Sequence, residues 1–361
     1  MMAKQPQKNK NDKKAPAMLY FFPKAKLFEF LLSFTQGKSK NTEVYLPLKR
    51  TDNVTRFERI TPTNAKESEK HFSLEQNSLF PIKEHFFAKH EIIFDFDAKK
   101  IVPQKPKVTP KVFFGLRRCD LAAITHQDKA FFEGGHIDPY YATRREQTLV
   151  FGYHCPTAPS QYCFCGSLNL EVRFDLMFFE TGIEKKTQDK NGFFLVEAGS
   201  EKGAALIKKF PSWFKQTGIA TAGINIKIPN SDRLHTLNLK PLYDHPDWKK
   251  GVDMCLSCGA CTTLCPTCYC FEFKDKVKMA NPKEGSRVRE WSSCQVPEFT
   301  KVAGGHVFRQ KREERFKHRI YHQLDYFKEK MGVDLCVGCG RCIEGCPTRI
   351  DFVDIINKMK K

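Results

Sequence analysis

The chain has 361 residues, 41% of them hydrophobic, which is enough for two or three domains with cores of their own. No apolar stretch is long enough for a membrane span, and 15 cysteines, an odd number, with no signal peptide argue against a disulfide framework. The net charge of +19 could indicate nucleic-acid binding, but the basic residues are dispersed and form no recognisable module. We therefore expect a cytoplasmic protein in a reducing compartment, with a lysine-rich surface that suits acidic partners.

The first elements in chain order are a tail and a helix. Residues 1–17 are polar and basic, which predicts a flexible tail. The run FPKAKLFEFLLSFTQ (22–36) carries leucines and phenylalanines at helical spacing, so a helix is expected there. Scattered phenylalanines between 40 and 105 indicate several short elements rather than one long one.

From residue 111 onward, strands alternate with helices. Strand-like runs lie at 111–115, 148–153, 174–179 and 193–198. Asp120 is expected to be the N-cap of the first helix, and Ser200 that of a helix reaching about residue 209. The alternation is typical of an α/β domain, which we place at 18–240. No G-x-G-x-x-G run follows a strand, so we predict no dinucleotide fold in this chain.

Four cysteines of this domain follow two consecutive strands. They are Cys119, Cys155, Cys163 and Cys165. Because the ends of adjacent parallel strands meet at one sheet edge, we expect these thiols to converge. Four thiolates there would hold an iron–sulfur cluster, with Asp120 as a possible replacement ligand. The alternative is a set of buried, inert thiols, because free cysteine packs as a small hydrophobe.

A second domain, at 245–361, carries one cysteine pattern twice. The first run holds Cys255, Cys258, Cys261 and Cys265, and the second run holds Cys336, Cys339, Cys342 and Cys346. Both read C-x2-C-x2-C-x3-C-P, the pattern with which two-cluster ferredoxins bind 4Fe–4S clusters. Zinc sites use paired cysteines or histidines instead, so we reject zinc.

In two-cluster ferredoxins the fourth cysteine of each run binds the cluster of the other run. The pattern therefore predicts cluster A on Cys255, Cys258, Cys261 and Cys346, and cluster B on Cys336, Cys339, Cys342 and Cys265. Glycines inside both runs remove side-chain bulk, so backbone N–H groups can approach the sulfurs and tune the reduction potential.

The segment between the runs is long, and we predict a helical insert at 271–333 that ends in an amphipathic helix at about 309–331. The fold class is thus α+β or α/β: an N-terminal α/β domain followed by an α-helical, ferredoxin-like domain with two 4Fe–4S clusters. Cys268, Cys270 and Cys294 remain outside the two runs. They either bind a further metal, together with His306, or shield cluster B.

Several stretches of the sequence resemble a known family. GLRRCDLAAI, DPYYATRRE, CFCGS, the first run through CYCF, SSCQVPEFTKVAGGHVFRQKREERFKHRIYHQ and CVGCGRCIEGCP follow one another between about 110 and 350. In these motifs the chain resembles the Fe–S β subunit of cytoplasmic group 3 nickel–iron hydrogenases (sulfhydrogenases) and, equally, the dicluster Fe–S subunit of anaerobic sulfite reductase. Hydrogenase relatives often read RPCD where this chain has RRCD, so the surroundings of a first-domain cluster stay open.

The resemblance implies a relay subunit without catalytic residues. Electrons would pass between a partner that binds FAD and NAD(P)H and a catalytic partner of the nickel–iron hydrogenase or sirohaem sulfite reductase type. The resemblance also implies metal binding by Cys119, Cys155, Cys163 and Cys165, hence a third Fe–S cluster. Two alternatives remain: a self-contained Fe–S reductase whose substrate meets a cluster beside Asp120, and an Fe–S protein that binds nucleic acid.

Overall fold

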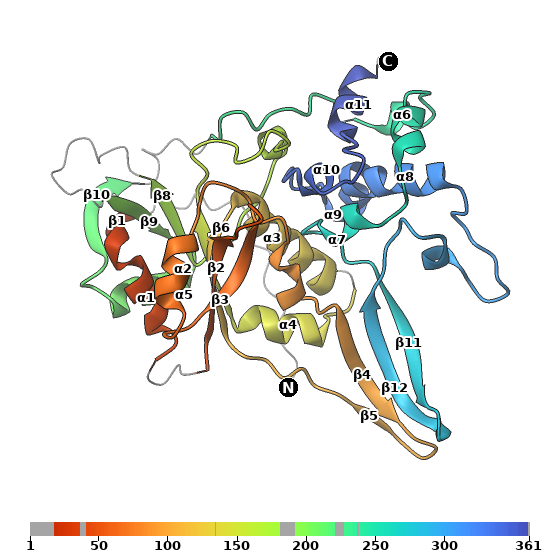
Figure 1. The fold of residues 1–361 in the computed structure, drawn as a ribbon, viewed down its shortest axis with the longest axis horizontal. Coiled ribbons are helices and arrows are strands. Elements are labelled where there is room, and N and C mark those ends of the chain that lie inside the picture. The colour runs from red at the N-terminus through yellow and green to blue at the C-terminus, as the bar shows by residue number, and fades with distance from the viewer. Residues whose placement is uncertain are drawn as a thin grey trace.

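The computed structural model describes residues 18–36, 41–133, 135–180, 192–220, 227–236 and 238–359. The tail expected at 1–17 lies outside these residues. The described chain forms a large sheet with helices on both faces, a small sheet that projects from it, and a group of helices near the C-terminus (Figure 1). Within the described ranges, no helix combines the length and apolar character that crossing a bilayer requires.

The large sheet has eight strands in the order β10-β1-β9-β8-β7-β6-β2-β3. Their bounds are β1 Met18–Pro23, β2 Glu43–Lys49, β3 Thr55–Ile60, β6 Lys111–Leu116, β7 Thr148–Tyr153, β8 Leu176–Glu180, β9 Phe193–Ala198 and β10 Lys215–Ala220. The central strands β2, β6, β7 and β8 are parallel, and the outer pairs are antiparallel. The expected α/β domain is therefore present, with β7 and β9 at the predicted residues.

Helices bury both faces of this sheet. They are α1 Leu27–Ser33, α2 Ala65–His71, α3 Arg118–Phe132, α4 Pro139–Glu146 and α5 Glu201–Lys209. Side chains of α1 and α5 pack with Phe151 and Phe178 on one face, and those of α3 and α4 pack with Phe113 and Phe179 on the other. The many phenylalanines thus fill the core between sheet and helices, where aromatic burial contributes most.

The two expected helix caps have different outcomes. Ser200 is the N-cap of α5, and its hydroxyl accepts from the backbone N–H of Gly203 at 3.1 Å, as predicted. The prediction for Asp120 was wrong, because Arg117 is the N-cap and α3 therefore begins at Arg118, three residues before the expected start. Asp120 lies one turn inside, where its carboxylate accepts from the Arg117 N–H at 3.2 Å. A carboxylate satisfies a free amide from that position as well as from the cap itself.

The small sheet joins distant parts of the chain. Its order is β11-β12-β4-β5, with β11 Phe271–Lys278, β12 Asn281–Trp291, β4 His90–Phe96 and β5 Ile101–Pro103. The first half of the predicted helical insert at 271–333 is therefore wrong, because a β-hairpin occupies it. Its apolar residues recur with period two at Phe271 and Phe273, which suits strands, and β12 pairs with β4 from the N-terminal half.

The second half of the insert is helical, as predicted. The C-terminal helices are α6 Trp248–Met254, α7 Ala260–Thr263, α8 Arg312–Tyr321, a π segment His322–Tyr326, α9 Phe327–Met331, α10 Arg341–Glu344 and α11 Phe352–Lys358. The segment from α8 to α9 buries Phe316, Ile320 and Leu324 along one face. It begins at Arg312 because the Glu314 carboxylate accepts from the N–H of Lys311 at 3.1 Å.

Candidate metal centre

The two cysteine runs adopt matching backbone conformations. Ser257 and Gly338 have φ of 54° and 64°, and Gly259 and Gly340, two residues further on, have φ of 76° and 74°. Left-handed backbone at both positions turns the chain tightly around the first cysteine of each run. Gly259 and Gly340 then serve as the N-caps of the short helices α7 and α10.

This turn aims backbone N–H groups at the first sulfur of each run. The Ser257 N–H donates to Cys255 Sγ at 3.4 Å, and the Gly338 N–H donates to Cys336 Sγ at 3.4 Å. Such hydrogen bonds stabilise a thiolate and, in a cluster, favour the more negative reduced state. The two runs therefore offer the same environment to their first ligand.

The cysteine that ends each run has a matched hydroxyl. Cys265 Sγ lies 3.2 Å from Thr267 Oγ1, and Cys346 Sγ lies 3.4 Å from Thr348 Oγ1. Each threonine follows the proline of the run, which the sequence pattern places there. The match is imperfect, because the Thr267 hydroxyl also reaches Gln323 Oε1 at 3.2 Å and donates only one hydrogen.

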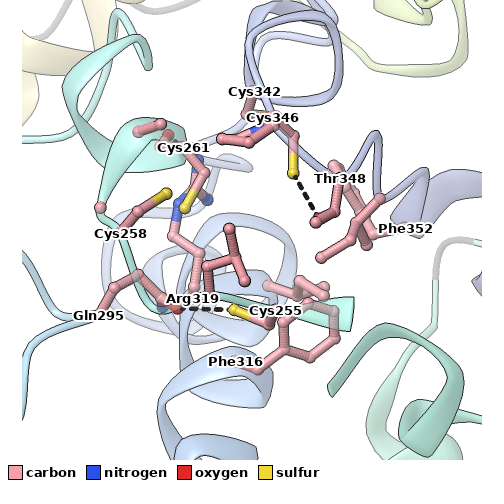
Figure 2. A pocket seen from close by; sticks show the side chains of 16 residues that line it. Cys255, Cys258, Cys261, Gln295, Phe316, Arg319, Cys342, Cys346, Thr348 and Phe352 are labelled. Carbon is pink, nitrogen blue, oxygen red and sulfur yellow. Dashed lines mark hydrogen bonds between the residues drawn. The ribbon is translucent and has the colours of Figure 1, made fainter. Parts of the chain in front are cut away.

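Cysteines from both runs meet in a pocket of about 640 Å³, which we call pocket A. Its cysteines are Cys255, Cys258, Cys261, Cys342 and Cys346. Figure 2 shows these cysteines around one space, with the apolar rings of Phe316 and Phe352 beside them. All four residues predicted for cluster A therefore lie on the wall of one pocket, although Cys346 is far from the other three in the sequence.

A second pocket, pocket B, has about 310 Å³ and the complementary set of cysteines. These are Cys265, Cys336, Cys339 and Cys342, the four residues predicted for cluster B. Phe164, Val337 and Phe352 form apolar walls around them. Cys342 and Arg319 line both pockets, so the two sites are neighbours.

The donor chemistry of both pockets fits 4Fe–4S clusters. Pocket A offers five thiols and pocket B offers four, and most of the other residues that line them are apolar. Among the described residues, no three His, Cys, Asp or Glu side chains converge closely enough to hold a single metal ion. The four thiolates that bind a cube of four irons lie farther apart than the ligands of a single ion. Cysteines spread around the wall of a pocket can have that wider spacing.

Burial keeps several of these thiols protonated when no metal is bound. It raises the pKa of Cys261 to about 12, against the opposing effect of the Arg319 guanidinium. It also raises the pKa of Cys336, although the Gly338 N–H acts in the opposite direction. Cationic iron would replace these protons, because a metal deprotonates the thiol that binds it. Cluster assembly would therefore release protons at these sites.

The first-domain cysteines gather at the carboxyl end of the parallel strands. Cys119 lies in the first turn of α3 after β6, Cys155 follows β7, and Cys163 and Cys165 lie in the loop beyond it. All four are buried. Burial raises the pKa of Cys163 to about 12 and that of Cys165 to about 11, and nearby Cys155 adds to both shifts. The donor set again fits a cluster.

Polar side chains point at two of these sulfurs. Arg117 Nη1 donates to Cys155 Sγ at 3.7 Å, and Asn77 Nδ2 donates to Cys163 Sγ at 3.7 Å. Donors of this kind are suited to the negative charge of a cluster rather than to neutral thiols. The first-domain site therefore has the guanidinium of Arg117 beside one of its sulfurs.

Asp120 is already occupied by other partners. One carboxylate oxygen lies 2.8 Å from Arg341 Nη2, in an ion pair whose side chains are 1% and 0% exposed, and the other accepts from the Arg117 N–H. The position is unsuited to a cluster ligand, since moving the carboxylate would leave a buried arginine without its counter-charge. Sequence reasoning missed Arg341, whose only signal is its place inside the second run.

The second run packs directly against the first-domain site. The Phe164 N–H donates to the Gly338 carbonyl at 2.8 Å. A Cβ on Gly338 would lie 2.5 Å from Cys165 N, and one on Gly340 would lie 2.6 Å from the Tyr162 carbonyl oxygen. Only glycine allows this approach, so pocket B and the first-domain cysteines are neighbours.

The three remaining cysteines form a short chain beside the first run. The side chain of Cys268 contacts Cys265, and that of Cys270 contacts Cys294. Cys268 and Cys270 also line a third pocket that includes Lys83 and Cys258. His306 is exposed and packs on Phe308 without lining this pocket, so the structure does not bring it to these thiols.

Comparison with known proteins agrees with this arrangement. A family model described as a 4Fe-4S dicluster domain matches residues 254–350, which include both runs. The chain is also 32% identical, over 345 residues, to the sulfhydrogenase 2 subunit beta of Pyrococcus furiosus (strain ATCC 43587 / DSM 3638 / JCM 8422 / Vc1). That alignment covers 92% of this chain and 97% of the relative.

Proposed function

Because this chain belongs to the family of the sulfhydrogenase beta subunits, we propose that it relays electrons between two partner subunits of an anaerobic oxidoreductase complex. One partner would carry FAD and bind NAD(P)H, and the other would be catalytic, of the nickel–iron hydrogenase or sirohaem sulfite reductase type. The chain itself would make and break no bonds of a substrate.

One observation carries the proposal. Each predicted ligand quartet lines a single pocket, and the two pockets share Cys342 and Arg319 on their walls. A relay needs redox groups that are close together and shielded from water, and two adjacent, mostly apolar pockets ringed by thiols meet both needs. Bound there, each cluster would take up and release one electron at a time.

The protein residues have separate tasks in this relay. The thiolates of the two runs would hold the clusters, with Cys346 crossing to cluster A and Cys265 crossing to cluster B. The N–H groups of Ser257 and Gly338 would stabilise negative charge on the sulfurs they contact. The apolar walls, among them Phe352 in both pockets, would exclude water.

The first-domain site extends the proposed path. Cys119, Cys155, Cys163 and Cys165 would hold a third cluster next to pocket B, because their loop packs on Gly338 and Gly340. Cys258, by contrast, is exposed. We propose that one partner docks near Cys258 and that electrons run through clusters A and B toward the first domain, or in reverse.

Metal analysis of the whole chain tests the proposal. Protein purified without oxygen should contain about eight irons and as many sulfides with two clusters, and about twelve with three. Zinc without sulfide would overturn the relay function. Eight irons would retain the relay but remove the third cluster.

Variants then locate each cluster. We expect Cys258→Ala to lose cluster A, lower the iron content by about four per chain and interrupt electron transfer. Cys155→Ala should lose only the first-domain iron, and Cys294→Ala should leave the iron content unchanged. Normal electron transfer from donor to acceptor in Cys258→Ala would contradict the assignment of cluster A.

A further inference from the structure

Arg319 lies on the walls of both cluster pockets. It belongs to α8, and its side chain lines pocket A and pocket B together with Cys342. Figure 2 shows Arg319 rising from the helix into pocket A, among the cysteines labelled around it. A cation at this point faces thiols from both runs at once.

The polar contacts of Arg319 leave its charge uncompensated. Its Nη2 donates to the Cys261 carbonyl at 3.2 Å, whereas its buried Nε finds no hydrogen-bond partner among the described residues. Within the described part of the chain, no carboxylate forms an ion pair with it. The groups that interact most strongly with its charge are the cysteines Cys268, Cys265, Cys261 and Cys342, and the last three belong to the two runs. A cation with a buried, unpartnered Nε is costly unless negative charge is placed beside it.

We propose that Arg319 is the shared counter-cation of clusters A and B and that it keeps the reduction potentials of both clusters higher than they would otherwise be. This inference rests on the proposed relay function. Each cluster gains one negative charge when it is reduced, and a positive charge nearby favours that step, strongly so where water is excluded. A cation between two anionic clusters also weakens their mutual repulsion, so an electron on one hinders reduction of the other less.

The chain contains a matched control on the same helix. Arg312 Nη1 donates to the Cys255 carbonyl at 3.2 Å, the same kind of contact and the same distance as that of Arg319 with Cys261. The side chain of Arg312 is exposed, however, and it lines neither pocket. Solvent and salt screen a charge there, so its removal should affect the potentials far less.

The experiment compares full-length wild type with Arg319→Met, Arg319→Lys and Arg312→Met, all purified without oxygen. Iron and sulfide are measured first, and each cluster is then titrated against potential while its reduced signal is followed by electron paramagnetic resonance. For Arg319→Met we expect the ratio of reduced to oxidised cluster at a fixed potential to fall at least about tenfold in both clusters. That corresponds to about 59 mV for one electron. Arg319→Lys should shift both potentials less, and Arg312→Met least.

Each other result has a defined meaning. Unchanged potentials in an Arg319→Met protein that retains its iron, or a shift confined to one cluster, would overturn the shared role. If Arg319→Met loses its clusters while Arg319→Lys keeps them, the positive charge itself is required, which supports the inference. If both variants lose their clusters, the role of Arg319 is structural and the inference fails. Wild type without iron and sulfide would instead overturn the relay function.

Discussion

The two cysteine runs have the same pattern and backbone but very different surroundings. In the first run, Leu256 is 64% exposed and Cys258 lies at the surface. In the second run, the residues from Val337 to Arg341 are all buried against the first domain. A short motif thus determines how the chain wraps a cluster, whereas the rest of the fold determines how far that cluster lies from water. Because burial tunes reduction potential, two similar runs can form two unequal steps of a relay.

The difference extends to the variable positions within the runs. Ala260 of the first run corresponds to Arg341 of the second, which pairs with Asp120 and donates from Nε to the Ser78 carbonyl at 2.5 Å. Likewise Ser257 corresponds to Gly338, where a side chain would meet the backbone of Cys165. These two differences between the runs therefore follow from contacts that only the second run makes.

The largest expected effect comes from the ion pair of the second run. Asp120→Asn should lower the free energy of unfolding by about 3–5 kcal/mol, because Arg341 would remain buried without a counter-charge. Denaturant unfolding of the iron-loaded protein measures this. Asp52→Asn, in the exposed pair with Arg56, is the control and should change little. Equal effects of the two variants would show that the second run is not anchored through Asp120.

A smaller effect is expected where a glycine of the second run replaces a serine of the first. Gly338→Ala should destabilise the protein by about 2–4 kcal/mol, from the left-handed backbone and the overlap with Cys165 and Phe164. Ser257 already carries a Cβ on the same left-handed backbone, so Ser257→Ala adds no atom and removes only the 3.5 Å contact of its hydroxyl with Arg315 Nη2. It should cost less than about 1 kcal/mol. Thermal unfolding and iron content of both variants make the comparison. If Gly338→Ala unfolds at the same temperature as the wild type, the two domains are not packed as tightly at Gly338 as the structure indicates.

The smallest expected effect tests the crossing of the fourth cysteines. Thr348→Val removes the hydroxyl beside Cys346. The cluster that Cys346 binds should then become slightly harder to reduce, because one hydrogen bond to its sulfur is lost. If Cys346 crosses over, the shift should appear in cluster A rather than in cluster B. Thr267→Val beside Cys265 should affect cluster B in the same sense, and less strongly, because Gln323 competes for that hydroxyl. Redox titration of each cluster measures these shifts. A shift of cluster B in Thr348→Val and of cluster A in Thr267→Val would rule out the crossing.

Sequence patterns predicted an element correctly where the local preference of the residues and their tertiary environment favour the same structure. The strands at 148–153 and 193–198 and the cap at Ser200 are confirmed, because largely buried strands and a serine cap have strong local signals. The helical insert was wrong at 271–291, because a short alternating run becomes a strand only when an edge such as β4 is available to pair with it. The N-cap was placed at Asp120 rather than at Arg117, because residue types alone do not show that the Asp120 carboxylate accepts from the Arg117 N–H.

The sequence by itself determined the eight cysteines of the two runs, their spacing and the glycines that let the backbone turn, because those features are local and follow from backbone sterics. Only the tertiary structure decided that Arg319 lines both pockets and that Arg341 pairs with Asp120. These depend on segments far apart in the chain being packed together. The charge of a buried group, and hence its effect on a neighbouring cluster, is therefore a property of the packed fold.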